Sequence, residues 1–137
     1  MRVVADSNIF VSALVFGGKP ERFLRSAEAG DFRLVASEEI LLEIADVLSR
    51  KFHRNADQVA ASLARVRAAS ETVHPRFTVA DCPDPDDNRV LEAAIEGRAD
   101  LIVSGDKHLL NMNPFRGVEI CTVASLLLRL DRSNREP

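Results

Sequence analysis

Four acidic residues lie where a carboxylate is expected to take part in chemistry. They are Asp6, Glu43, Asp87 and Asp106. Asp6 and Asp106 each follow a short apolar run typical of a buried strand, where a carboxylate is costly unless it is paired or binds a metal. Carboxylates gathered in one place repel one another, and a hard divalent cation such as Mg²⁺ or Mn²⁺ commonly holds them together. The pattern therefore indicates metal-dependent chemistry on phosphate groups.

Helical geometry singles out Glu43 among the acids of its segment. It lies one turn from both Ile40 and Val47, which belong to the apolar face of an amphipathic helix, so it borders that face. A glutamate in this position can bend toward the edge of the sheet and meet Asp6. Glu39 lies at an intermediate angle and remains the alternative.

The third acid comes from an acidic turn that precedes another helix. Asp87 is one turn ahead of Val90 and Leu91, so its side chain should share their inward face. Asp86 lies less centrally on that face, and we expect it to cap the helix. Asp86 remains an alternative to Asp87 as the site residue, and Asp84 is a weaker candidate.

Polar and basic residues supply supporting candidates. Asn8 can reach the site of Asp6 or orient a bound water, and Ser104 can bind a metal-bound water or a phosphate. The basic candidates for contact with nucleic acid phosphates are Arg50, Lys51, Arg54 and Lys107. Such a charge run is more often a solvated face. The alternative is a track for a nucleic acid backbone.

Composition and charge narrow the possible classes. The chain carries 18 basic and 21 acidic residues, a net charge of −3 that argues against a high-affinity, sequence-independent nucleic acid binder. A nuclease remains compatible, because bound Mg²⁺ offsets an acidic site. The two cysteines and three histidines show no metal-ligand spacing, which argues against zinc. Without a signal peptide or a membrane-length apolar run, we expect a cytoplasmic protein with no membrane contact.

Strand and helix signals alternate, which predicts βα units around a parallel sheet. The expected strands are 2–5, 32–36, 71–74, 101–104 and 118–121. The expected helices are 7–15, 20–29, 38–50, 55–69, 86–96 and 123–130. The fold class is therefore α/β, a Rossmann-like three-layer α/β/α sandwich with a central parallel sheet of four to five strands. Its carboxyl edge should bring Asp6 and Asp106 together.

The length of 137 residues suits one domain, which we place at 1–130, followed by a disordered tail at 131–137.

Four motifs together resemble the PIN domain (PilT N-terminus) family over about residues 1–128. They are VVADSNIFVSA at 3–13, EEILLEIADVL at 38–48, PDPDDNRVLEAA at 83–94 and IVSGDKHLL at 102–110. The resemblance places the acids of that family at Asp6, Glu43, Asp87 and Asp106. One departure is Ser104, where many relatives have threonine, and the hydroxyl is retained.

The resemblance implies a PIN-like fold and endonuclease activity that cleaves RNA with Mg²⁺ or Mn²⁺. It is strongest to the ribonuclease toxin branch of toxin–antitoxin pairs, which implies a homodimer and inhibition by a small antitoxin protein. Two other hypotheses stay open. One is a non-catalytic module that binds RNA or a partner. The other is an aspartyl phosphatase with Asp6 as nucleophile, although that class needs a second aspartate where this chain has Asn8.

Overall fold

A single five-stranded parallel sheet forms the centre of the computed structural model, which describes residues 1–135. The strand order is β3-β2-β1-β4-β5, and every neighbouring pair is parallel. The strands are β1 (Arg2–Ala5), β2 (Arg33–Ser37), β3 (Ser70–Val73), β4 (Leu101–Val103) and β5 (Glu119–Cys121). The predicted Rossmann-like α/β fold with a parallel sheet is confirmed.

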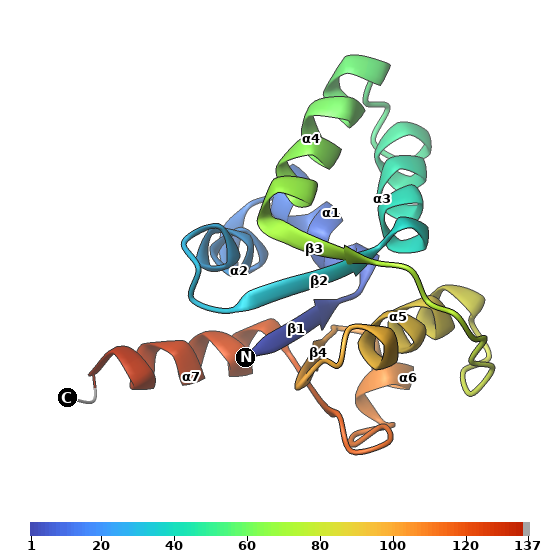
Figure 1. Cartoon of the computed structure of the whole chain (residues 1–137). Helices are drawn as coiled ribbons and strands as arrows, with labels where there is room; N and C mark the ends of the chain where they lie inside the picture. The colour runs from blue at the N-terminus through green and yellow to red at the C-terminus, as the bar shows by residue number, and fades with distance from the viewer. Residues whose placement is uncertain (136–137) are drawn as a thin grey trace.

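Seven helices in the described residues cover the sheet. They are α1 (Ser7–Val15), α2 (Gly18–Glu28), α3 (Glu38–Arg50), α4 (Ala56–Ala69), α5 (Pro85–Glu96), α6 (Lys107–Leu110) and α7 (Val123–Arg135). Crossovers between parallel strands are right-handed, so the connections stepping from β1 to β3 and those stepping back to β5 cover opposite faces. In Figure 1, α1 to α4 occupy the upper part of the view, and α5 and α6 the lower right.

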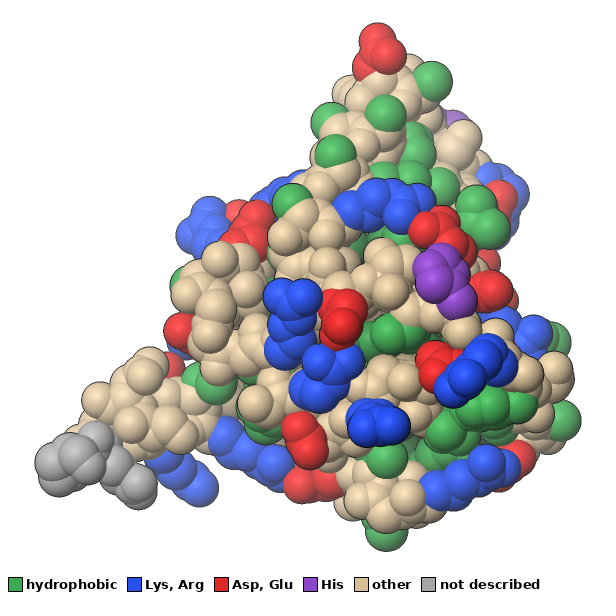
Figure 2. All heavy atoms as spheres, viewed as in Figure 1, with side chains coloured by type: hydrophobic (Ala, Val, Ile, Leu, Met, Phe, Trp, Pro, Cys, Tyr) green, Lys and Arg blue, Asp and Glu red, His purple; other side chains and the backbone are tan. Residues whose placement is uncertain are grey.

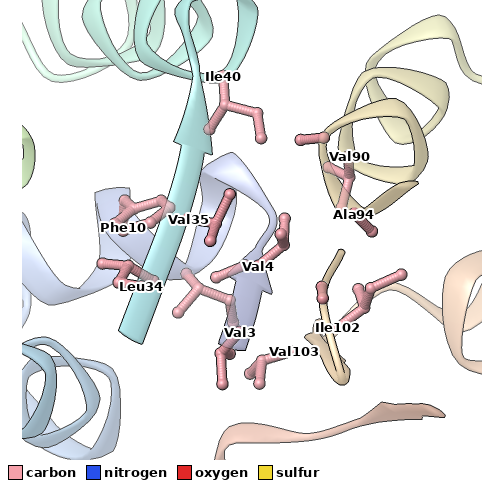
Figure 3. Close-up of a cluster of buried hydrophobic side chains, with 14 of the residues drawn as sticks. Val3, Val4, Phe10, Leu34, Val35, Ile40, Val90, Ala94, Ile102 and Val103 are labelled. Carbon is pink, nitrogen blue, oxygen red and sulfur yellow. The ribbon is translucent and has the colours of Figure 1, made fainter. Parts of the chain in front are cut away.

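The core consists of short strands rich in β-branched residues, which pack between these layers of helices. Val4 pairs in register with Val35 on one side and Ile102 on the other, so the three side chains point to the same face. Figure 3 shows them beside Val90 of α5. The contact is close: a Cβ on Gly97, directly after α5, would lie 2.5 Å from Cγ1 of Val35. This packing fixes α5 over the centre of the sheet.

Helix α3 is positioned by its first residues. Ser37 ends β2, and its hydroxyl accepts a hydrogen bond from the backbone N–H of Ile40 at 3.3 Å, which makes Ser37 the N-cap of α3. Ile40, Leu41 and Ile44 are buried. The strand-to-helix turn and the apolar face therefore fix the rotation of α3, and with it the direction of Glu43.

The C-terminal helix is longer than the sequence analysis expected. Helix α7 runs to Arg135 instead of ending at Leu130, so for residues 131–135 the predicted disordered tail is corrected to helix; residues 136–137 lie outside the described part. Asp131 pairs with Arg22 of α2 at 3.8 Å, and the basic side chains of the last turn face the negative end of the helix dipole. Within residues 1–135, no helix is long and apolar enough to cross a membrane.

Candidate active site

Asp6 and Asp106 follow the neighbouring strands β1 and β4, so both emerge at the carboxyl edge of the sheet. Ala5 pairs with Val103, and the backbone N–H of Asp6 donates to the carbonyl of Val103 at 3.2 Å. Asp6 is only 5 % exposed, and its Oδ1 accepts the N–H of Ile9 at 3.0 Å, which caps α1. The cap uses one carboxylate oxygen of Asp6, so capping and a site role are compatible.

Ser104 links the two acids. Its hydroxyl is fully buried, donates to Oδ2 of Asp6, and accepts the backbone N–H of Asp106 at 2.9 Å. These two bonds orient both carboxylates, and the contact of Ser104 with a metal-bound water or a phosphate stays a prediction. Oδ1 of Asp106 accepts the N–H of His108 at 2.7 Å and so caps α6.

Asp87 completes a group of three buried or half-buried carboxylates. It is 6 % exposed, and its Oδ2 has no hydrogen-bond partner among residues 1–135. Burial, with the charges of Asp106, Asp84 and Asp6 as further causes, raises the pKa of Asp87 to about 6. Burial also raises the pKa of Asp6, and the charge of Asp106 adds to that shift. Burial and neighbouring negative charge therefore disfavour the charged forms of Asp6 and Asp87.

The prediction that Asp86 caps α5 is wrong. The N-cap is Asp84, whose Oδ1 accepts the N–H of Asp86 at 2.9 Å, and Pro85 occupies the first helical position. Proline suits that position because its φ angle is already helical and no N–H is needed there. The helix consequently begins earlier than predicted, with Asp87 on its buried side and Asp86 exposed.

Glu43 lies in an adjoining cleft. It is half-buried and shares that cleft with Ser7, Glu39, Asp86 and Arg89. Burial raises the pKa of Glu43, followed by the charge of Asp86. Asp86 shares this cleft and is the acid whose charge acts most on Glu43, and the meeting of Glu43 with Asp6 stays a prediction. The acids therefore form two neighbouring groups, Asp6–Asp87–Asp106 and Glu43–Asp86.

The donor set suits a hard divalent cation, although the side chains do not close around one. Within the described residues, no three acidic, histidine or cysteine side chains converge closely enough to hold a metal ion. The chemistry nevertheless fits Mg²⁺ or Mn²⁺, because the available donors are carboxylate oxygens and Oδ2 of Asp87 is buried without a partner. Burial first, and then repulsion by neighbouring acids, raises the pKa values of Asp6 and Asp87, and a cation would offset that repulsion.

An open cavity of about 260 Å³ gives access to this group of acids. It is lined by Asp6, Asn8, Ile9, Ser12, Gly105 and Asp106. Asn8 is exposed and lines the cavity together with Asp6, and its supporting role stays a prediction. The cavity therefore opens from solvent onto Asp106 and the buried Asp6.

Two buried polar residues of α5 were not anticipated from the sequence. Asn88 exchanges two hydrogen bonds of 2.8 Å with the backbone of Cys82, and Glu92 accepts the N–H of Val79 at 2.8 Å. Both anchor the irregular segment 79–82 to α5 and so fix the turn that precedes Asp87. Their burial could have been predicted from their four-residue spacing, which places both on the helix face that carries the buried apolar residues.

The residues predicted to contact RNA differ in whether their side-chain charges are already paired with an acid. Arg50 pairs with Asp46 at 3.0 Å, whereas Lys51 and Lys107 are exposed. The backbone N–H of Arg54 donates to the carbonyl of Leu48 at 3.0 Å, which holds the turn after α3. On the face shown in Figure 2, basic and acidic side chains are interspersed. Attraction to phosphate would therefore be local on this face.

The fold and site define an α/β protein with an acidic cleft at the carboxyl edge of a parallel sheet. Comparison with known proteins specifies it further: residues 2–108 match the PIN domain family, and the chain belongs to that family. PIN domains are generally nucleases. The chain is also 32 % identical over 117 residues to the uncharacterized protein MJ1680 of Methanocaldococcus jannaschii, covering 82 % of this chain and 75 % of that protein.

Proposed function

We propose that the protein is a metal-dependent endoribonuclease that hydrolyses phosphodiester bonds in RNA. The observation that carries the proposal is the group of buried Asp6 and Asp87 with half-buried Asp106, in which Oδ2 of Asp87 lacks a partner among residues 1–135. Burying carboxylates that repel one another costs stability. Their presence here therefore indicates that they serve a function.

Each acid has a role in this proposal. Asp6, Asp87 and Asp106, with Glu43 from the adjoining cleft, would hold one or two Mg²⁺ or Mn²⁺ ions. Such an ion supplies an activated water and offsets the negative charge of the phosphate. Ser104 fixes the orientation of Asp6 and Asp106, and Asn8 is placed to contact the substrate or a water.

A cleavage assay on a mixed RNA panel tests the proposal. Wild type should cleave with Mn²⁺, stop with EDTA and recover when Mn²⁺ is added back. Asp106→Asn should lose cleavage while remaining folded. The matched control is Asp81→Asn, since Asp81 is exposed and makes only a long pair with Arg116 at 3.7 Å. Full activity in Asp106→Asn would refute the acidic site.

As part of the same proposal, the enzyme is the toxin of a toxin–antitoxin pair, acts in the cytoplasm as a homodimer, and is inhibited by a small antitoxin protein. Its support is the resemblance of the four sequence motifs to that branch. Induced expression of wild type in a bacterial host should arrest growth, and expression of Asp106→Asn should not. Equal growth with both proteins would contradict the toxin role.

One alternative has an observation in its favour. The acids do not converge into a metal-holding arrangement within residues 1–135, as would suit a non-catalytic module that binds RNA or a partner. RNA binding in EDTA without cleavage in Mg²⁺ would support that alternative. The phosphatase hypothesis has no such support, because Asp6 is buried and both of its carboxylate oxygens accept hydrogen bonds.

A further inference from the structure

Phe16 is the most exposed large apolar residue of the described chain. Its side chain is 72 % exposed, at the C-terminal end of α1. The chain then turns sharply at Gly17 into Gly18, the first residue of α2, and both glycines have positive φ. These backbone conformations favour glycine and leave Phe16 projecting at the corner between the two helices.

The helix places Phe16 in line with the acidic cavity. Asn8, Ser12 and Phe16 follow at four-residue spacing, so they share one face of α1. Asn8 and Ser12 line the cavity that contains Asp6 and Asp106. Phe16 therefore lies one further turn beyond the lining residue Ser12, about 6 Å along the helix axis.

The ring of Phe16 is braced by a second aromatic ring. Phe52 lies just beyond the end of α3, and the two ring centroids are 5.6 Å apart with an interplanar angle of 79°. This edge-to-face contact joins the C-terminal ends of α1 and α3, the helices that carry Asn8 and Glu43. It limits the motion of the Phe16 ring and still leaves most of that ring in solvent.

Positive charge accompanies the aromatic pair. Nζ of Lys51 lies 5.7 Å from the centroid of the Phe52 ring, and Lys51 forms no ion pair within residues 1–135. Lys19 is also exposed, close in sequence to Phe16. Proteins bind single-stranded nucleic acid by stacking its bases on aromatic rings and contacting its phosphates with lysines. The solvent-facing ring of Phe16, near exposed lysines, fits this mode of binding.

We propose that Phe16, braced by Phe52 and flanked by Lys51, is a stacking platform for a base of single-stranded RNA adjacent to the cleavage site. This proposal rests on the proposed function, because it assigns a subsite to the same substrate. A protein partner is a weaker match, because the exposed large apolar residues are scattered over separate elements: Met1, Phe16, Leu42, Phe77 and Leu128. The platform would accept any base, since stacking needs only a ring face.

The test uses a short single-stranded RNA that carries fluorescent 2-aminopurine, whose emission falls when it stacks. Binding is measured with Mg²⁺ in the Asp106→Asn background, so that cleavage does not consume the probe. Phe16→Leu keeps apolar bulk but removes the ring. It should weaken binding about tenfold and abolish the stacking quench, and Phe16→Trp should restore both.

Phe77→Leu is the matched control, because Phe77 is an exposed phenylalanine outside the platform, and it should bind as the background protein does. Unchanged affinity and quench in Phe16→Leu would overturn the platform, as would absence of probe binding by the background protein. A change in oligomeric state in Phe16→Leu, seen by light scattering, would overturn it in favour of a protein contact. Failure of the nuclease proposal is separate: wild type would then leave RNA intact while Phe16 still governed binding.

Discussion

The hydroxyl of Ser104 donates a hydrogen bond to the carboxylate of Asp6, a residue 98 positions earlier in the chain. The same oxygen accepts the N–H of Asp106, so one buried serine orients the acids that follow β1 and β4. Parallel pairing of these two strands brings the three residues together. The register between β1 and β4 therefore determines the geometry of the candidate site.

Replacing Ser104 with alanine should reduce both stability and cleavage. Asp6 would lose a donor and the N–H of Asp106 would lose its acceptor, at a cost of about 1 to 3 kcal/mol in unfolding free energy. We expect at least about tenfold slower RNA cleavage, because the carboxylates would no longer be held in place. Chemical denaturation and cleavage rates measure the two effects.

Ser104→Thr provides the control, because it retains the hydroxyl and should keep most of the activity. Wild-type cleavage by Ser104→Ala would show that the serine has no positioning role.

Asp87 should make stability depend on pH. Its folded pKa is raised from 3.8 to about 6, so folding favours the protonated carboxyl. The resulting stability is fully present below about pH 4 and is lost as pH rises through about 6. In EDTA at pH 8, Asp87→Asn should therefore be more stable than wild type by about 1 to 2 kcal/mol, a value reduced for solvent screening.

Thermal unfolding between pH 4 and 8 measures this difference, which should disappear near the acidic end. A stability gain of equal size at every pH would contradict the assigned cause, since the repulsion requires ionised carboxylates.

Asn88 should matter for the placement of Asp87. Asn88→Ala removes two buried hydrogen bonds to Cys82 and should lower the unfolding free energy by about 2 kcal/mol. Cleavage should fall as well, because the turn before Asp87 loses its anchor. Asn134→Ala is the matched control, since Asn134 is exposed on α7 far along the chain. Equal denaturation midpoints for the two variants would refute the anchoring role.

The two glutamates facing the second cleft should differ in importance. Glu43 is half-buried and close to Asp86, whereas Glu39 is exposed, although both line the cleft. We expect Glu43→Gln to reduce Mn²⁺-dependent cleavage by about tenfold or more, with Glu39→Gln close to wild type. A larger loss of cleavage in Glu39→Gln would identify Glu39, instead of Glu43, as the fourth acid of the site. Cleavage rates over a Mn²⁺ titration compare the two directly.

Much of the fold could be predicted from the sequence, because the patterns that indicate strands and helices are local. Apolar runs predicted the strands, and the apolar face that includes Ile40 predicted α3. The start of α5 was missed, because three aspartates around Pro85 offer competing caps, and tertiary packing decides among them. The last turns of α7 were missed because polar residues there carry no apolar pattern.

For the site, strand order mattered more than residue type. Asp6 and Asp106 could be paired from the rule that parallel strands share a carboxyl edge. The division of the acids into two groups depends on how α3 and α5 pack, which no local pattern encodes. The positioning role of Ser104 also depends on register, since its bond to Asp6 exists only when β1 and β4 are aligned.

Direct measurement of Mn²⁺ binding tests the central claim that the buried acids form a cation site. Isothermal titration at pH 7.5 would compare wild type with Asp87→Asn and with the exposed control Asp81→Asn. The account predicts saturable binding in wild type and in Asp81→Asn, weakened at least about tenfold in Asp87→Asn. No binding by folded wild type, or equal binding by Asp87→Asn, would contradict it.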